Sequence, residues 1–159
     1  MLGFFKGKSK DNIIYSPCKG KVVPITEVSD PTFSEKVLGD GFAVIPSEGK
    51  IYAPADGEIS MVFDTLHAVT MTTSQGTELL IHIGLDTVQL EGKFFEAKVE
   101  AGQRVKKGDL LIRCELEKIQ EAGYQTITPV IVTNTDDYTD IETLISGKTE
   151  PGMELLRVR

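Results

Sequence analysis

The sequence predicts an all-β domain, a sandwich or barrel of short strands with one or two short helical turns. From residue 15 onward, apolar stretches rich in Val and Ile recur, and Gly, Pro, Asp and Ser separate them. The length of 159 residues allows one domain with a sizeable core. The predicted strands are residues 20–24, 41–46, 50–53, 57–63, 68–72, 78–84, 94–98, 109–115, 128–133 and 153–158.

Helical signals are confined to two short segments. Asp30 and Pro31 favour the start of one or two turns that run to residue 38, and Gly39 ends them. The second segment covers residues 116–122 and ends at Gly123. Both helices are predicted to be short.

A repeated motif indicates duplication within the domain. The sequence SPCKGKV at residues 16–22 and APADGEI at residues 53–59 share a small residue, Pro, Gly, a charge and a β-branched residue, at an offset of 37. In each copy Pro fixes φ, and Gly permits the turn that starts a strand. The repeat predicts a duplicated β unit that closes on itself, and chance recurrence of a short turn motif is the alternative.

The N-terminal segment differs from the rest of the chain. Residues 1–12 combine Leu and Phe with three lysines, a composition that suits either a flexible tail or weak contact with an anionic bilayer. We therefore predict a flexible basic and apolar tail over residues 1–12 and a folded domain over residues 13–159.

Charge and composition exclude several classes of protein. The excess of 24 acidic over 17 basic residues gives a net charge of −7, which opposes binding to nucleic acid and suits a basic protein partner. Cys18 and Cys114 lie far apart and lack metal-ligand spacing, so the sequence predicts neither a disulfide framework nor a structural zinc site. No apolar stretch reaches the roughly 18 residues of a membrane span, and no signal-peptide pattern is present. We expect a cytoplasmic protein.

The chain contains two histidines, and His82 lies in a predicted strand. Alternation places Leu80, His82 and Gly84 on one face of this strand, and Gly84 would let a large group approach the imidazole. A histidine that is simply hydrogen-bonded on a mixed face is the alternative.

His67 follows a predicted strand and lies two residues after Thr65. If the strand extends that far, the threonine hydroxyl lies beside the imidazole and can fix its tautomer. A turn threonine beside a surface histidine explains the pattern equally well. The 15 residues between His67 and His82 are enough for neighbouring strands to bring the two rings together.

Two facing imidazoles suit phosphoryl transfer better than the other reactions of histidine. A catalytic zinc site takes three protein ligands, and the sequence has no third histidine, no His-x-His and no His-Glu-x-x-His. No Gly-x-Ser-x-Gly motif for a serine nucleophile occurs. Phosphoryl capture needs only a neutral imidazole nitrogen, a neighbouring donor and an apolar rim, which this sequence can supply.

Several motifs in order give the chain a resemblance to a known family. The sequence DPTFSEKVLGDGFAVIPSEG at residues 30–49 is followed by APADGEI, FDTLHAV and ELLIHIGLDTVQLEGKFFE. From about residue 14 to residue 158, the chain resembles the glucose-type enzyme IIA domain of the bacterial phosphoenolpyruvate:sugar phosphotransferase system. The heptapeptide HIGLDTV at residues 82–88 is the most specific of these motifs. The resemblance implies a β-sandwich of the duplicated hybrid type with a shallow active-site depression.

The resemblance also assigns roles to residues. It implies that His82 is the histidine phosphorylated at Nε2, and that His67 donates a hydrogen bond to the phosphoryl group. It further implies that Thr65 orients His67 and that Asp86 lies at the pocket edge. The residues implied to bind partners are Asp30, Phe33, Val37, Leu38 and Phe63.

The resemblance implies a phosphocarrier that receives the phosphoryl group from HPr and passes it to a cysteine of a IIB domain of a sugar permease. It implies no required cofactor, although some relatives share a zinc ion at a partner interface between the two histidines, here His67 and His82, and a partner carboxylate. Departures from the family occur beside the site, at Asp64, Leu66 and Ile83.

Two other classes of function remain as alternatives. The unphosphorylated face can be a regulatory module that binds permeases or other proteins outside the phosphotransferase system. Related sandwich hybrids also serve as zinc peptidases and as biotinyl or lipoyl carriers, but the peptidase His-x-His and the carrier lysine at a hairpin tip are absent.

Overall fold

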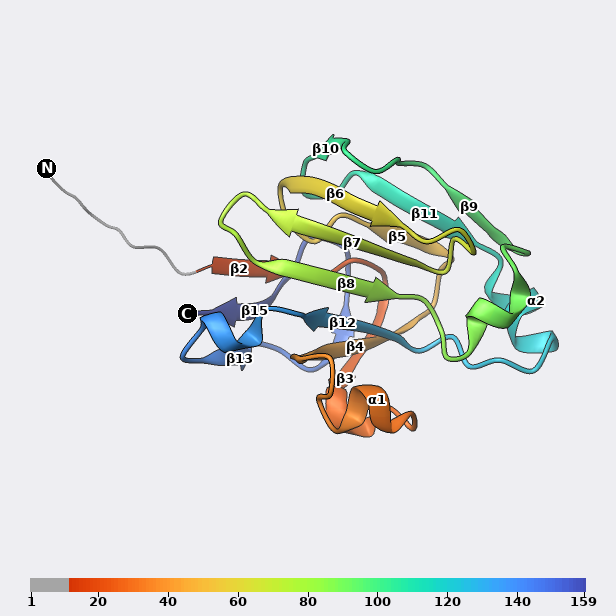
Figure 1. Cartoon of the computed structure of the whole chain (residues 1–159). Helices are drawn as coiled ribbons and strands as arrows, with labels where there is room; N and C mark the ends of the chain where they lie inside the picture. Colours follow the sequence, from red (N-terminus) through yellow and green to blue (C-terminus); the bar gives the residue numbers. More distant parts are fainter. Residues whose placement is uncertain (1–11) are drawn as a thin grey trace, which may run out of the picture.

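The computed structural model describes residues 12–159 and consists of three antiparallel sheets (Figure 1). The large sheet has the strand order β10 (Arg104–Val105), β6 (Gly57–Val62), β7 (Ala68–Thr73), β8 (Glu78–His82), β12 (Thr128–Val132), β4 (Asp40–Pro46), β3 (Gly20–Pro24) and β14 (Gly147–Thr149). The smaller sheets have the orders β5 (Lys50–Tyr52), β11 (Leu110–Cys114), β9 (Phe95–Ala97) and β13 (Ile141–Thr143), β15 (Glu154–Val158), β2 (Asn12–Tyr15). The predicted all-β fold is confirmed.

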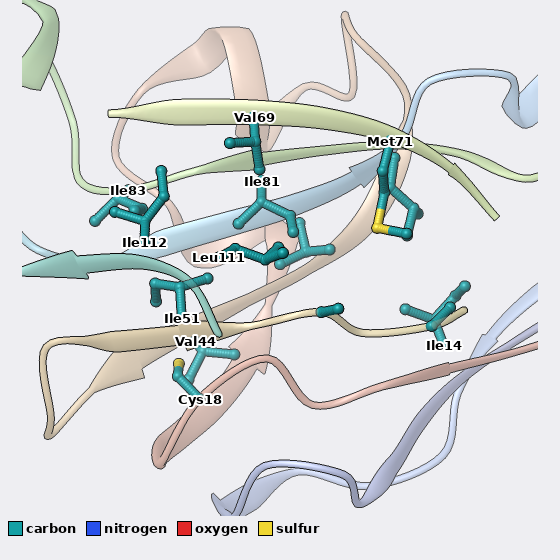
Figure 2. Close-up of a cluster of buried hydrophobic side chains, with 14 of the residues drawn as sticks. Ile14, Cys18, Val44, Ile51, Val69, Met71, Ile81, Ile83, Leu111 and Ile112 are labelled. Atoms are coloured by element: carbon teal, nitrogen blue, oxygen red, sulfur yellow. The ribbon is translucent and has the colours of Figure 1, made fainter. Parts of the chain in front are cut away.

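The main core lies between the large sheet and the two small sheets. Val69, Met71 and Ile81 of the large sheet pack in one cluster with Ile51 of β5 and Leu111 of β11. Figure 2 shows these side chains pointing toward one another between the strands. Alternation along β7 and β8 places Val69, Met71 and Ile81 on this face. Burial of this apolar surface holds the sheets together.

A second core covers the other face of the large sheet. Two short helices, η1 (Ile25–Glu27) and α1 (Pro31–Ser34), contribute Ile25 and Phe33 to a cluster with Ala43, Leu80 and Ile131 of the sheet. We call residues 25–39 the strap, because this segment connects β3 to β4 across the sheet face (Figure 1). The strap brings residues of α1 next to the end of β8.

The repeated motif has equivalent positions in the fold, as duplication predicts. The backbone N–H of Tyr15 donates to the carbonyl of Pro54, and the N–H of Tyr52 donates to the carbonyl of Pro17. Tyr52 and Pro54 lie 37 residues after Tyr15 and Pro17, so the two copies of the motif make equivalent bonds to each other. Gly20 and Gly57 each begin a strand, and a Cβ on either would lie within 2.3 Å of a carbonyl oxygen of the paired strand. Close approach of backbones, and not a turn with positive φ, therefore explains both glycines.

Every predicted strand exists, with ends within two residues of those expected. The structure adds the short strands β2, β10, β13 and β14, whose two to four residues give too little alternation to be seen in the sequence. The predicted strand over residues 78–84 ends at His82, because Gly84 has φ of 80°. Asn12 is the first residue of β2, although the flexible tail was predicted to include it. The other residues of the predicted tail, 1–11, lie outside the described residues.

The two predicted helices exist, and the first is shorter than expected. Asp30 caps α1 by accepting from the N–H of Thr32, and Pro31 takes the first position. The helix ends at Ser34 and does not continue to residue 38, because Lys36 adopts a left-handed φ of 59°. The second helix, α2, covers Leu116–Glu121, and two further short turns are η2 (Thr87–Leu90) and η3 (Thr135–Asp137).

Both cysteines are buried as free thiols. Burial raises the pKa of Cys18 and of Cys114 to about 12, so both remain protonated at neutral pH. Across residues 12–159, no helix has the length and apolar character that crossing a bilayer would require.

Candidate active site

Strand pairing brings the two histidines together. His82 is the last residue of β8, and it pairs with Ala68, the first residue of β7. His67 precedes Ala68, and its carbonyl accepts a hydrogen bond of 2.7 Å from the N–H of Ile83. The two imidazole rings consequently meet edge to face, with their centroids 4.7 Å apart.

A backbone carbonyl fixes the orientation of His82. Nδ1 of His82 lies 2.7 Å from the carbonyl oxygen of Gly84. Because a carbonyl only accepts, Nδ1 carries the proton. In the neutral ring the lone pair is then on Nε2, so the bond to Gly84 makes Nε2 the nucleophilic nitrogen.

Gly84 is required for a turn after β8, whereas the sequence suggested that it opens the strand face beside His82. Its φ of 80° turns the chain out of β8, so it does not share the strand face of His82. A Cβ would lie 2.6 Å from Cγ2 of Thr87 and 2.7 Å from the carbonyl oxygen of Gln125. The glycine thus permits the turn that aims its own carbonyl at His82.

His67 is oriented by a side chain in the preceding turn. Oγ1 of Thr65 lies 2.7 Å from Nδ1 of His67. The contact arises because β6 ends at Val62 and residues 63–67 form a turn, in which Leu66 has φ of 62°. The strand does not extend to Thr65 and His67, so the two residues do not share a strand face and meet through this turn instead.

Two phenyl rings flank the pair of imidazoles. Phe33 of the strap lies 5.0 Å from the His82 ring, and Phe63 lies 5.4 Å from the His67 ring. Phe33 is only 4% exposed, so it packs against His82 and presents little surface to a partner. Each imidazole therefore lies against the other imidazole and against one phenyl ring.

Burial keeps both imidazoles neutral near pH 7. Burial, followed by the neighbouring His82, lowers the pKa of His67 to about 4. Burial also lowers the pKa of His82, and the Gly84 carbonyl, Asp30 and Asp86 oppose this shift. A neutral imidazole is the form that acts as a nucleophile.

Acidic residues lie at one side of the site. A groove of about 470 Å³ runs between Asp30 of the strap, Asp86 after β8 and residues 123–125. The two carboxylates act electrostatically on His82, as the direction of their effect on its pKa shows. The structure thus places both predicted acidic residues beside the histidine.

The remaining predicted partner-binding residues lie on the strap and are exposed. Val37 is 69% exposed and Leu38 is 40% exposed. Val88, in η2 next to Asp86, is 44% exposed. These three apolar side chains are exposed and lie close in sequence to Phe33 or Asp86, and their role in binding a partner stays a prediction.

The donor set of the site provides two metal ligands and no more. Over residues 12–159, no group of three or more His, Cys, Asp or Glu side chains is placed to hold a metal ion. His67 and His82 could supply two neutral imidazoles, and a structural or catalytic zinc site needs at least one further ligand.

Reasoning from the sequence did not identify two contributors to this site. One is the Gly84 carbonyl, which the side-chain pattern does not reveal. The other is Thr87, whose buried hydroxyl donates to the carbonyl of Ile83. Thr87 lies inside the HIGLDTV motif, and its place in this motif is the sequence feature that could have identified it.

Comparisons with known proteins agree with this site. Residues 12–138 match the family described as phosphoenolpyruvate-dependent sugar phosphotransferase system, EIIA 1. The glucose-specific EIIA component of Bacillus cereus is 45% identical over 152 residues, which cover 95% of this chain and 92% of that protein. The structure of glucose permease IIA from Mycoplasma capricolum matches with a TM-score of 0.87 and 34% identity, covering 94% of this chain and 96% of that one.

Other relatives are longer, multidomain proteins. The beta-glucoside-specific EIIBCA component of Bacillus subtilis is 49% identical over 144 residues, which cover 91% of this chain and 24% of that protein. The chain therefore spans about a quarter of the length of this relative. The family match, the near full-length relative and the shared β-sandwich together place the chain in the EIIA 1 family of the phosphoenolpyruvate-dependent sugar phosphotransferase system.

Proposed function

We propose that the chain is a phosphocarrier whose His82 accepts a phosphoryl group from phosphorylated HPr. His82 then passes this group to a cysteine of a IIB domain of a glucose-type sugar permease. The observation that carries the proposal is the hydrogen bond between Nδ1 of His82 and the Gly84 carbonyl, because it leaves the lone pair on Nε2. The chain is thus a phosphotransferase component with a transient phosphohistidine.

Each transfer is an in-line displacement at phosphorus. In the first, Nε2 of His82 attacks, the Nε2–P bond forms, and the P–N bond of phosphorylated HPr breaks with its electron pair returning to HPr. In the second, the IIB thiolate attacks and the electron pair of the Nε2–P bond returns to His82. Nδ1 keeps its proton throughout, since the Gly84 carbonyl holds it.

The acidic residues stabilise the phosphorylated state. A ring with phosphorus on Nε2 and a proton on Nδ1 carries a positive charge. Asp30 and Asp86 favour a positive charge on His82, and the Gly84 carbonyl accepts from Nδ1. The same carboxylates suit a basic group on the partner, in keeping with the net charge of −7.

His67 supports the transfer by hydrogen bonding. When the hydroxyl of Thr65 donates to Nδ1 of His67, the proton of the neutral His67 ring is on Nε2. This N–H can donate to a phosphoryl oxygen on the neighbouring ring, whose centroid is 4.7 Å away. The burial of His67, which is 3% exposed, restricts the ring to this arrangement.

The scheme requires no cofactor, because the imidazoles and the IIB thiolate supply the chemistry. Residues 12–159 place His67 and His82 as two ligands and add no third, so we expect zinc only where a partner carboxylate completes the site. Zinc titration with and without a partner tests this: the isolated chain should bind zinc far more weakly than the complex.

Intact-mass measurement tests the carrier function. After incubation with phosphoenolpyruvate, enzyme I and HPr, the chain should gain about 80 Da as acid-labile phosphate, and the His82→Ala variant should gain none. The His67→Gln variant should still accept the phosphoryl group but donate poorly to IIB. A wild-type chain that gains no mass would contradict the carrier function.

A regulatory role is distinguished by a binding assay. Phosphorylation of His82 adds charge beside Phe33 of the strap, so a regulatory module should retain a protein outside the phosphotransferase system only while it is unphosphorylated. A chain that acts only as a carrier should retain none in either state.

A further inference from the structure

Thr87 is a buried polar residue that the proposed chemistry does not use. Its side chain is 0% exposed, and it is the first residue of η2. Its hydroxyl donates to the carbonyl of Ile83, and its methyl group packs where a Cβ on Gly84 would lie. A completely buried hydroxyl is stabilising only when it is paired, so this bond has a structural consequence.

The bond closes the turn that carries the acceptor for His82. Three further contacts fix the same turn: the N–H of Ile83 donates to His67, that of Gly84 to Ile127, and that of Leu85 to Gln125. These bonds restrain the N–H groups of the turn. Thr87 restrains a carbonyl, that of Ile83, immediately before the Gly84 carbonyl that accepts from His82.

We propose that Thr87 is a positioning residue that holds the Gly84 carbonyl against Nδ1 of His82 and thereby keeps the reactive lone pair on Nε2. Without the Thr87 hydroxyl, the turn loosens and the Ile83 carbonyl is left without this donor. The bond from Nδ1 to Gly84 then lengthens, and the tautomer with the proton on Nε2 becomes populated. That tautomer has no lone pair on Nε2 and cannot attack phosphorus there.

Three substitutions separate the hydroxyl from the shape of the residue. Thr87→Val keeps the shape and removes the hydroxyl, whereas Thr87→Ser keeps the hydroxyl and removes the methyl group. Thr77→Val is the matched control, because Thr77 is also 0% exposed and its hydroxyl bonds Tyr138. Thr77 immediately precedes β8, and His82 is its last residue. The length of this strand puts Thr77 about 16 Å from His82.

The first readout is the tautomer of His82 in the unphosphorylated protein, from ring nitrogen chemical shifts in long-range ¹H–¹⁵N spectra. Wild type, Thr87→Ser and Thr77→Val should show the proton on Nδ1. Thr87→Val should shift the ring nitrogens toward the Nε2–H form. A merely structural role for Thr87 would lower stability in both valine variants and leave the tautomer unchanged.

The second readout is the rate of phosphoryl acceptance from phosphorylated HPr. Thr87→Val should lower kcat about tenfold, the factor that one ordinary hydrogen bond accounts for, and leave KM for HPr unchanged. KM is unaffected because a residue that is 0% exposed does not touch HPr. Thr87→Ser should restore kcat.

The outcomes also separate this inference from the proposed function on which it rests. If Thr87→Val keeps the wild-type tautomer and rate, or if Thr87→Ser behaves as Thr87→Val does, the positioning role is wrong. If wild type is never phosphorylated, the carrier function fails, while the tautomer measurement still tests Thr87. Should Thr87→Val not fold, Thr87→Ala removes the same hydroxyl and gives the same test.

Discussion

His67 and His82 lie edge to face, with ring centroids 4.7 Å apart and planes at 85° to each other. Each ring is held at Nδ1, His67 by the Thr65 hydroxyl and His82 by the Gly84 carbonyl. Holding both rings at Nδ1 leaves both Nε2 atoms for the chemistry. One is a nucleophile and the other a hydrogen-bond donor in the proposed transfer.

The buried His67 makes stability depend on pH. Its pKa is about 4 in the folded protein, against 6.5 for an unperturbed histidine. Between these values the unfolded chain binds a proton that the folded chain does not, so the free energy of unfolding falls as pH falls, by about 3 kcal/mol in total. Well above pH 6.5 the ring is neutral in both states and adds no pH dependence.

Urea unfolding of wild type and His67→Gln across this window checks the prediction. The variant lacks the titrating ring, so its stability should fall less steeply with decreasing pH than that of wild type. Parallel curves would show that His67 is not the group responsible.

Thr65 should matter more for donation than for acceptance of the phosphoryl group. Thr65→Val removes the hydroxyl that fixes the tautomer of His67 but leaves His82 and its bond to Gly84 in place. We expect transfer to IIB to slow about tenfold. Single-turnover transfer from the phosphorylated variant to IIB measures this, with Thr65→Ser as the control that should transfer at the wild-type rate.

Gly84→Ala should destabilise the protein and displace His82. The new Cβ meets Thr87 and the Gln125 carbonyl, and alanine also resists a φ of 80°. Gly76→Ala is a matched control, because Gly76 has φ of 94° and its Cβ would meet nothing within 4 Å. Gly84→Ala should be less stable than Gly76→Ala by about 1 to 3 kcal/mol, the cost of overpacking.

Urea unfolding of these two alanine variants measures the difference. The spectrum of the His82 ring should change only in Gly84→Ala. Equal stabilities would indicate that backbone strain alone, and not the close approach of Thr87 and Gln125, requires the glycine.

Phe33 and Val37 both lie on the strap, but we predict that Phe33 contributes to stability and Val37 to binding of HPr. Phe33 is 4% exposed, so Phe33→Ala should lower the free energy of unfolding by about 3 kcal/mol and free the His82 ring. Val37 is 69% exposed, so Val37→Ala should change stability by less than about 0.5 kcal/mol. Val37→Ala should instead raise KM for HPr.

Thermal unfolding and transfer kinetics of the two variants distinguish these roles. A Phe33→Ala protein as stable as wild type, or a Val37→Ala protein with unchanged KM, would refute the corresponding assignment.

Local sequence predicted most of the fold because strand alternation and turn residues act over a few positions. The strands around His82 and the helix start at Asp30 and Pro31 were visible for this reason. The ends of these elements were less visible, since Lys36 and Leu66 adopt left-handed backbone conformations that their residue types do not announce. The short strand β14 forms only because β3 supplies its hydrogen bonds.

The groups available for chemistry can be read from the sequence: two histidines, a threonine two residues before one of them, and acidic and apolar residues at spacings that match a family. How these groups meet depends on long-range packing. The pairing of β7 with β8 brings the imidazoles together, and the packing of the strap places Phe33 against His82. The choice of nucleophilic nitrogen depends on the backbone carbonyl of Gly84, which lies in a turn whose N–H groups donate to the carbonyls of Gln125 and Ile127. Those contacts join segments about 40 residues apart in the chain, beyond the range of local sequence patterns.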